Sequence, residues 1–313
     1  MAAFVTYFYF IINLIISIEL EAVQDKWSYE GLTGPKHWKK YYPACGRGDQ
    51  SPIDIFKKGI RTILRRKTSP LTYNHYEDYV TRGIMKNIGS TVTLHINDLK
   101  PSITFETHFK VTYNFEEIRF HWGDTNSKGT EHVFDGEHFA LEMQFIHYDN
   151  RFESYDVAKV NGSNIAILAV LYEASTEDNK QLTSIIETLD DITYVNQEAR
   201  LKYAMKLRDM LPASLDFVRY DGSLTIPPCT SGVSWWVYQD LHHISDFQIS
   251  KFRKLSMTKF NLSTNDWGNI RPLTGRFLRK VEVYSTSSFN QPMIILQVLI
   301  SFIRMFYLNL IMF

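Results

Sequence analysis

The 313-residue sequence predicts a mainly β domain (α+β), with one central sheet and short surface helices. Runs of alternating or β-branched residues recur through the middle of the chain, and clusters of turn-forming residues separate them. Only two stretches have helical spacing. No repeat and no long Ser/Gly/Pro linker divides the chain, and barrel-like or all-β domains of about 200 to 250 residues are commonly single units. The sequence therefore predicts one globular domain.

The expected elements follow in chain order. Strands are expected at 90–96 (STVTLHI), 103–113 (ITFETHFKVTY), 117–122 (EIRFHW), 140–148 (ALEMQFIHY) and 164–174 (NIAILAVLYEA). A turn cluster at 126–129 follows the third of them. Helical spacing predicts helices at 182–189 (LTSIIETL) and around 199–210.

The charge balance excludes one class of partner. Lys and Arg number 34, as do Asp and Glu, so the chain lacks the basic excess of a nucleic-acid-binding protein. The densest basic run, KKGIRTILRRK from Lys57 to Lys67, forms either a solvated face or a contact for glycosaminoglycan or anionic lipid.

The two strands at 117–122 and 140–148 carry the chemistry. Residues two apart on a strand point to the same face, so Arg119 and His121 share one face, as do Glu142 and Gln144. A His-x-His pair with a third histidine from the neighbouring strand would give an open three-nitrogen zinc site. Here the three positions hold Arg119, His121 and Gln144. A guanidinium stays protonated and offers only donors, and a glutamine carbonyl is a poor zinc ligand beside imidazole.

Five motifs in order carry a family resemblance. GPKHW (34–38), CGRGDQSPIDI (45–55), FHWG (120–123), GTEH (129–132) and DGSLTIPPC (221–229) resemble signatures of the alpha-class carbonic anhydrases. The resemblance runs from about Trp27 to Tyr284 and implies a large twisted, mainly antiparallel sheet with short surface helices. One departure is NIRPLTGR (269–276), which is shorter than the family's segment and leaves the local loop uncertain.

In active members of that family, the resemblance places the zinc ligands at Arg119, His121 and Gln144. The Arg, His, Gln combination is similar to the acatalytic carbonic anhydrase-related proteins. The EMQ strand is also similar to the anhydrase-like ectodomains of receptor tyrosine phosphatases. These relatives are implied to bind other proteins, especially at cell surfaces.

The resemblance also assigns the remaining positions of a vestigial pocket. It implies that Thr225 is the hydroxyl that orients zinc-bound hydroxide, with Glu131 as its carboxylate partner. Glu142 matches the acid that holds the third zinc histidine, and Ser90 stands at the proton-shuttle position, where it cannot relay protons at neutral pH. The apolar walls of the carbon dioxide pocket match Ile146, Ile167, Leu224 and Trp235.

Two interpretations of Arg119 remain open. Arg119 either replaces the missing positive charge and pairs with Glu142 or Glu131, since an unpaired buried carboxylate is costly, or it points into the cleft and binds a small anion. Other histidines have structural interpretations. His147 faces away from Gln144 and is expected in the core, and His132 of GTEH is expected in structural hydrogen bonds. The pair His242 and His243 is expected on the surface.

Features of an exported protein surround the domain. The resemblance implies a disulfide between Cys45 and Cys229, with two free buried cysteines as the alternative. Asn161-Gly-Ser and Asn261-Leu-Ser fit the N-glycosylation pattern. Residues 1–22 resemble a signal peptide or an uncleaved N-terminal anchor, and 23–285 form the expected domain. Residues 286–313 form a hydrophobic tail: a membrane anchor, a glycolipid-anchor signal, or an amphipathic helix packed on the domain or a partner.

Two functions follow from these observations. The first is a catalytically inactive, secreted or cell-surface protein that uses no cofactor and binds an unnamed protein, such as a cell-surface receptor or adhesion protein. The second is an active zinc-dependent carbonate dehydratase with an atypical metal site, in which His121 is joined by Glu142 or His147. The strand faces disfavour the second, because His147 faces away from Gln144 and Glu142.

Overall fold

The computed structural model describes residues 27–56, 64–65, 70–107, 109–162, 164–257, 268–274 and 281–285. The strands within them are β1 (Asp54–Ile55), β2 (Leu64–Arg65), β3 (Leu71–Asn74), β4 (Tyr79–Val80), β5 (Gly83–Asn87), β6 (Val92–Ile96), β7 (Ser102–Glu106), β8 (Lys110–Trp122), β9 (Val133–Phe134), β10 (Leu141–Asp149), β11 (Ile165–Ser175), β12 (Glu198–Arg200), β13 (Met205–Lys206), β14 (Phe217–Ser223), β15 (Ser231–Tyr238), β16 (His242–Ser245) and β17 (Glu282–Ser285).

The described helices are short. They are η1 (Gly31–Thr33), α2 (Trp38–Tyr41), η2 (Pro43–Gly46), α3 (Tyr155–Asn161), η3 (Lys180–Leu182), α4 (Thr183–Leu189), η4 (Leu207–Met210) and α5 (Asp246–Arg253). In α5, the Ser245 side chain accepts from the main-chain N–H of Gln248, and the Gln248 side chain bonds back to Ser245 in a capping box. The predicted mainly β fold with short surface helices is confirmed.

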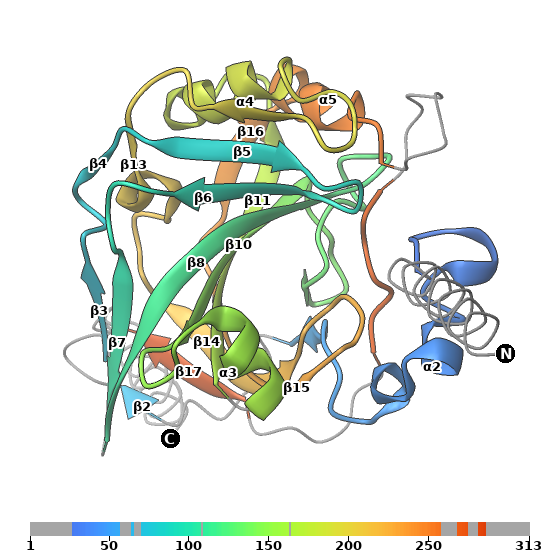
Figure 1. The fold of residues 1–313 in the computed structure, drawn as a ribbon, viewed down its shortest axis with the longest axis vertical. Coiled ribbons are helices and arrows are strands. Elements are labelled where there is room, and N and C mark those ends of the chain that lie inside the picture. The colour runs from blue at the N-terminus through green and yellow to red at the C-terminus, as the bar shows by residue number, and fades with distance from the viewer. Residues whose placement is uncertain are drawn as a thin grey trace, which may run out of the picture.

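A 13-stranded sheet dominates the molecule, in the order β12-β5-β6-β8-β10-β11-β15-β14-β17-β2, with β16 beside β11, and β7 pairing with both β3 and β8. Most pairs are antiparallel, but β11 runs parallel to β15 and β16, and β17 runs parallel to β2, so the sheet is mixed. The long strands β8, β10 and β11 curve through its centre, with α4 and α5 together at one end (Figure 1).

Two predicted elements differ from the structure. The run 103–113 is not one strand: β7 and β8 form a hairpin in which Glu106 pairs with Lys110. The residues between these strands include no Gly, Pro or Asn, so no turn signal separates them in the sequence. The stretch 199–210 is not a helix but contains β12, β13 and η4, because pairing with β5 and β4 satisfies its backbone instead.

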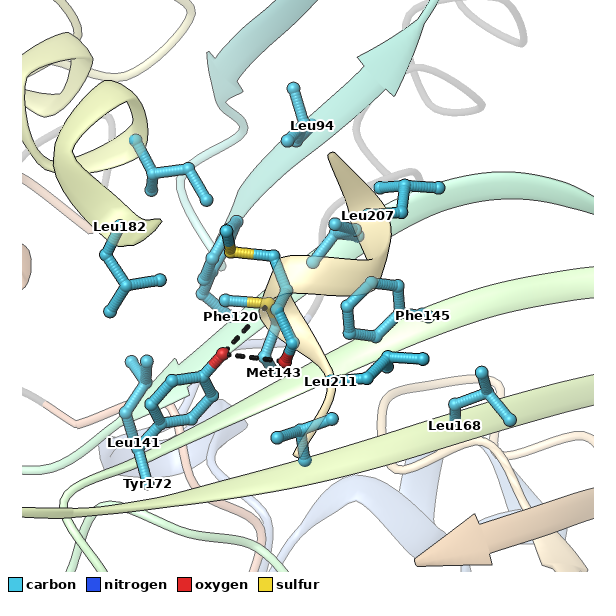
Figure 2. Packing of buried hydrophobic residues seen from close by; sticks show 14 of the residues in the cluster. Leu94, Phe120, Leu141, Met143, Phe145, Leu168, Tyr172, Leu182, Leu207 and Leu211 are labelled. Carbon is cyan, nitrogen blue, oxygen red and sulfur yellow. Dashed lines mark hydrogen bonds between the residues drawn. The ribbon is translucent and has the colours of Figure 1, made fainter. Parts of the chain in front are cut away.

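Both faces of the central strands are buried. One cluster packs Phe120, Met143, Phe145 and Leu168 against the helical side, where the Tyr172 hydroxyl donates to the Met210 carbonyl at 3.1 Å (Figure 2). Burial on this face orients β8 and β10, since alternate residues must then point to the other face. The opposite face holds the candidate site.

Candidate functional site

Antiparallel pairing of β8 and β10 brings the predicted site residues together. Arg119 lies opposite Gln144, and His121 lies opposite Glu142. Directly opposed residues of an antiparallel pair have their side chains on the same face, within about 5.5 Å at Cβ. The prediction that these four side chains share a face is therefore confirmed.

Arg119 pairs with Glu117, two residues earlier on the same strand. Its Nε and Nη2 both contact Oε1 of Glu117, while Nε2 of His95 lies 3.1 Å from Oε2. Burial alone would raise the pKa of Glu117, but the charge of Arg119 and the bond to His95 outweigh it and lower that pKa. The predicted pairing with Glu142 or Glu131 is wrong, because the nearest carboxylate on this face belongs to Glu117.

Gln144 connects the two carboxylates that Arg119 does not reach. Its Nε2 donates to Oε2 of Glu131 at 2.9 Å and to Oε1 of Glu142 at 2.8 Å, and its side chain is buried. The amide nitrogen is thus committed to two acceptors. A buried carboxylate needs such donors, since leaving it unbonded costs several kcal/mol.

Glu142 is the most fully bonded of these carboxylates. It accepts from the main-chain N–H groups of Glu131 and His132 and from Nδ1 of His132, in addition to Gln144. Burial raises its pKa, but His132 and these hydrogen bonds dominate and lower the pKa to about 2. Glu142 is therefore an ionised structural group at neutral pH.

His121 has one bonded and one unbonded nitrogen. Its Nδ1 lies 2.9 Å from the main-chain carbonyl of Asn269, and because a carbonyl only accepts, Nδ1 carries the proton. Its Nε2 lies 3.6 Å from Oε2 of Glu131 and has no hydrogen-bond partner, although the side chain is 1% exposed. The imidazole is held in place with a bare nitrogen directed toward the Glu131 side of the pocket.

Glu131 is bound by Gln144 and by the segment 268–274, and not by Thr225. It accepts the Gln144 amide and the main-chain N–H of Arg271, at 3.1 Å. Thr225 is buried, and no hydrogen bond joins it to Glu131 in the described part of the chain.

Gly129 allows the GTEH loop to approach β10, since a Cβ there would lie 1.9 Å from the Ala140 carbonyl oxygen.

The apolar walls also assemble. Ile146, Ile167, Leu224 and Trp235 belong to one buried cluster on the site face of the sheet. Ser90 is half-buried in the turn before β6, and its carbonyl accepts from Nδ2 of Asn269 at 3.1 Å. The four apolar residues are therefore buried together on the site face, and their role as walls of a carbon dioxide pocket stays a prediction.

The fold agrees with the comparisons to known proteins. The model of the eukaryotic-type carbonic anhydrase family matches residues 33–285. The chain belongs to this family. It is 33% identical to carbonic anhydrase 6 of Canis lupus familiaris over 258 residues, which cover 80% of this chain and 78% of that protein.

Two further relatives mark the breadth of the carbonic anhydrase family. Carbonic anhydrase 15 of Mus musculus is 30% identical over 283 residues, covering 86% of this chain and 84% of that protein. Receptor-type tyrosine-protein phosphatase zeta of Homo sapiens is 33% identical over 232 residues, covering 72% of this chain and 10% of that protein.

The residues present do not fit the zinc of a catalytic carbonic anhydrase. Such a site takes three protein ligands, and this pocket offers one imidazole nitrogen, on His121. Arg119 has no lone pair to give, and Gln144 could offer only its carbonyl oxygen, which is a poor zinc ligand beside imidazole, because its amide nitrogen is a donor. Within the described residues, no group of three or more His, Cys, Asp or Glu side chains is placed to hold a metal ion.

Asn269 and Arg271 are functional neighbours to which the sequence reasoning assigned no role. Asn269 accepts from the Trp122 N–H and donates to the Phe120 and Ser90 carbonyls, while its own carbonyl receives His121. Arg271 is buried and donates to Gln50 and to carbonyls of three segments. The signal was the Asn-x-Arg-Pro pattern itself, which lies within the segment noted only as a departure.

The other histidines follow their predictions with one exception. His147 is buried, with Nε2 2.7 Å from the Tyr76 hydroxyl, and His132 bonds Glu142 and Tyr220, so both structural roles are confirmed. His243 is exposed. The prediction for His242 is wrong, because it is half-buried and stacks on Tyr172 with the ring centroids 5.2 Å apart.

The features of an exported protein are tested in part. Cys45 and Cys229 form the expected disulfide, which closes a separation of 184 residues. Asn161 is exposed at the end of α3. Asn261, the signal-like residues 1–22, the tail at 286–313 and nearly all of the basic run 57–67 lie outside the described residues. Among the described helices, none is long and apolar enough to cross a membrane.

Proposed function

We propose that the protein is a catalytically inactive carbonic anhydrase-related protein that acts outside the cell as a binding protein. One observation carries the proposal. Two of the three positions that correspond to zinc ligands hold Arg119 and Gln144, and both side chains are committed to carboxylates. They serve as structural replacements for a metal centre.

The chemistry of hydration explains why this replacement removes activity. Zinc lowers the pKa of bound water from 15.7 to about 7, which provides hydroxide at neutral pH. No group in this pocket supplies that effect, so Thr225 and Glu131 have no nucleophile to orient. Ser90 at the shuttle position could not carry protons away.

Binding outside the cell is supported from three directions. The disulfide is typical of oxidising compartments. One similar protein is named as a receptor, and the hydrophobic segments at both ends suit export and membrane attachment. The partner that we propose is a cell-surface protein, with glycosaminoglycan as an added contact through Lys57 to Lys67.

Metal content and turnover test the loss of activity directly. We expect the full-length protein, secreted from eukaryotic cells, to contain no stoichiometric zinc and to leave the rate of carbon dioxide hydration unchanged. A variant carrying Arg119→His and Gln144→His, prepared in parallel, serves as the matched positive control. Bound zinc together with hydration by the unaltered protein would refute the proposal and favour the atypical metal site.

Cell binding tests the second half of the proposal. The secreted protein should bind intact cells saturably, and digestion of cell-surface protein should abolish binding. If heparinase removes binding as completely as protease does, glycosaminoglycan rather than protein is the principal partner. Absence of saturable binding to a panel of cell types would contradict the binding role.

A further inference from the structure

Among the described residues, several buried polar atoms on the site face lack a hydrogen-bond partner. One is Oγ1 of Thr93, directly opposite Arg119, and three others come from distant segments. These three are the hydroxyl of Tyr29, Nε2 of His121 and the hydroxyl of Tyr155. Tyr29 precedes η1, His121 is on β8 and Tyr155 begins α3. Buried polar groups are paired in the great majority of cases, and each exception needs an explanation.

The two phenols share one neighbour. Tyr29 and Tyr155 both interact electrostatically with the guanidinium of Arg119. Burial raises the pKa of each phenol, so each stays protonated at neutral pH and can donate a hydrogen bond. Both phenols are therefore within electrostatic range of Arg119, and no described residue uses their hydroxyl groups as donors.

Arg119 itself has unused donors. Its contacts with Glu117 occupy the Nε and Nη2 side of the guanidinium, and both reach the same carboxylate oxygen. The opposite edge of a guanidinium, formed by Nη1 and the second hydrogen of Nη2, can hold another oxyanion in a bidentate pair. Nη1 makes no hydrogen bond with a described residue. The side chain is 14% exposed, so it is not sealed from solvent.

We propose that this pocket binds a carboxylate, held by the free edge of Arg119 and by the hydroxyls of Tyr29 and Tyr155. The inference rests on the proposed function, since zinc at His121 would change the charge of the same pocket. The positive charges of Arg119 and Arg271 lie among three carboxylates of the site face, those of Glu117, Glu131 and Glu142. The surrounding charge therefore does not favour an anion, and only weak binding is expected. A ligand of four non-hydrogen atoms in such surroundings should bind with a Kd of about a millimolar.

Acetate titration of the full-length protein tests the pocket. We expect line broadening of ¹³C-labelled acetate to saturate during the titration and to give a Kd of about a millimolar. Acetamide, its neutral counterpart, should bind at least ~10-fold more weakly. Equal binding of acetate and acetamide, or no saturable acetate binding, would overturn the proposal.

Tyrosine variants locate the site without disturbing the fold. Because neither hydroxyl has a hydrogen-bond partner among the described residues, Tyr29→Phe and Tyr155→Phe should leave thermal stability unchanged and weaken acetate binding about 5-fold each. Tyr79→Phe, at an exposed tyrosine on β4, is the matched control and should bind acetate as the unaltered protein does. Unchanged acetate affinity in both site variants would contradict the assignment.

Two further measurements, peptide binding and zinc content, distinguish a protein terminus from a free acid and separate failure of this inference from failure of the proposed function. A short peptide with a free carboxyl end that binds more tightly than acetate would identify a protein terminus as the ligand, and binding of acetate alone would identify a free acid. Equal binding by the amidated peptide would overturn the proposal. Zinc is measured on the same sample, so failure of acetate binding without zinc refutes only this inference, whereas zinc with hydration refutes the proposed function.

Discussion

Arg119 forms a buried ion pair at a position where the family resemblance implies a zinc ligand. The guanidinium brings a permanent positive charge onto a buried strand face, and Glu117 at the next position on that face neutralises it. Glu117 in turn shares its second oxygen with His95, which is partly exposed. The chain of contacts connects the pocket to solvent along β8 and β6.

Removing one member of the Glu117–Arg119 pair should destabilise the protein strongly, whereas replacing both with apolar residues should change stability little. Glu117→Leu leaves Arg119 without its carboxylate and should lower the free energy of unfolding by about 3 kcal/mol. The double variant with Arg119→Leu should lie within about 1 kcal/mol of the unaltered protein. Urea denaturation of the two variants measures both values. A single variant that loses little stability would mean that Arg119 re-pairs with Glu131 or Glu142.

His147 should make the protein sensitive to acid. Burial lowers its pKa to about 3, against 6.5 for an ordinary histidine. Between those values the unfolded chain binds one more proton than the folded chain, so stability is complete above pH 6.5 and falls as the pH decreases toward 3. The slope from this one group approaches about 1.4 kcal/mol per pH unit.

His147→Phe tests that slope. The variant loses the contact with the Tyr76 hydroxyl and starts less stable at pH 7.5. Its free energy of unfolding should then fall less steeply between pH 6.5 and 4 than that of the unaltered protein. The difference in slope should correspond to the uptake of nearly one fewer proton on unfolding. Parallel stability curves for the two proteins over this interval would show that His147 is charged when folded.

At the scale of elements, the sequence predicted what depends on local periodicity. The alternation of residues 117–122 and 140–148 placed Arg119, His121, Glu142 and Gln144 on one face, and the structure confirms it. The β7–β8 hairpin escaped prediction because its turn lacks the usual turn-forming residues. The strands within 198–206 escaped prediction because pairing with the distant strands β5 and β4 overrides their helical spacing.

The sequence analysis missed Glu117 as the partner of Arg119 for a related reason. Glu117 shares its face by the same period of two, yet the family comparison directed attention to Glu131 and Glu142. Those carboxylates are taken by donors that come from elsewhere in the chain, including the main-chain N–H of Arg271. Spacing on a strand predicts neighbours well, and it cannot predict which distant donors compete for them.

The segment 268–274 joins elements that the sheet does not connect. Buried Arg271 donates to the carbonyls of Cys45, Ser51 and Leu224. Arg271→Met should leave these acceptors unsatisfied and lower the free energy of unfolding by about 3 kcal/mol. Thermal unfolding measures the loss. Arg200→Met, at an exposed arginine on β12 that forms no ion pair with a described residue, is the control and should leave the melting temperature unchanged.

At the scale of the whole molecule, the fold brings together the residues at which the family resemblance implies a zinc site. The strand register, the Asn269 contact to His121 and the contacts to Glu142 are in place. These features would orient imidazoles if they were restored, since second-shell hydrogen bonds fix the orientation of metal-bound histidines. The structure therefore predicts that zinc binding can be regained by few changes.

Reversion should occur in two distinguishable steps. Arg119→His with Gln144→His should bind one zinc and gain measurable carbon dioxide hydration, because three imidazoles then meet on one face. In the presence of a chelator this variant should be less stable than the unaltered protein by about 3 kcal/mol, since Glu117 has lost its guanidinium. Adding Glu117→Gln removes that buried charge and should recover most of the loss. Zinc content, hydration rate and chelator-dependent melting measure the three effects; a double variant that binds no zinc would show that the pocket has lost more than its ligands.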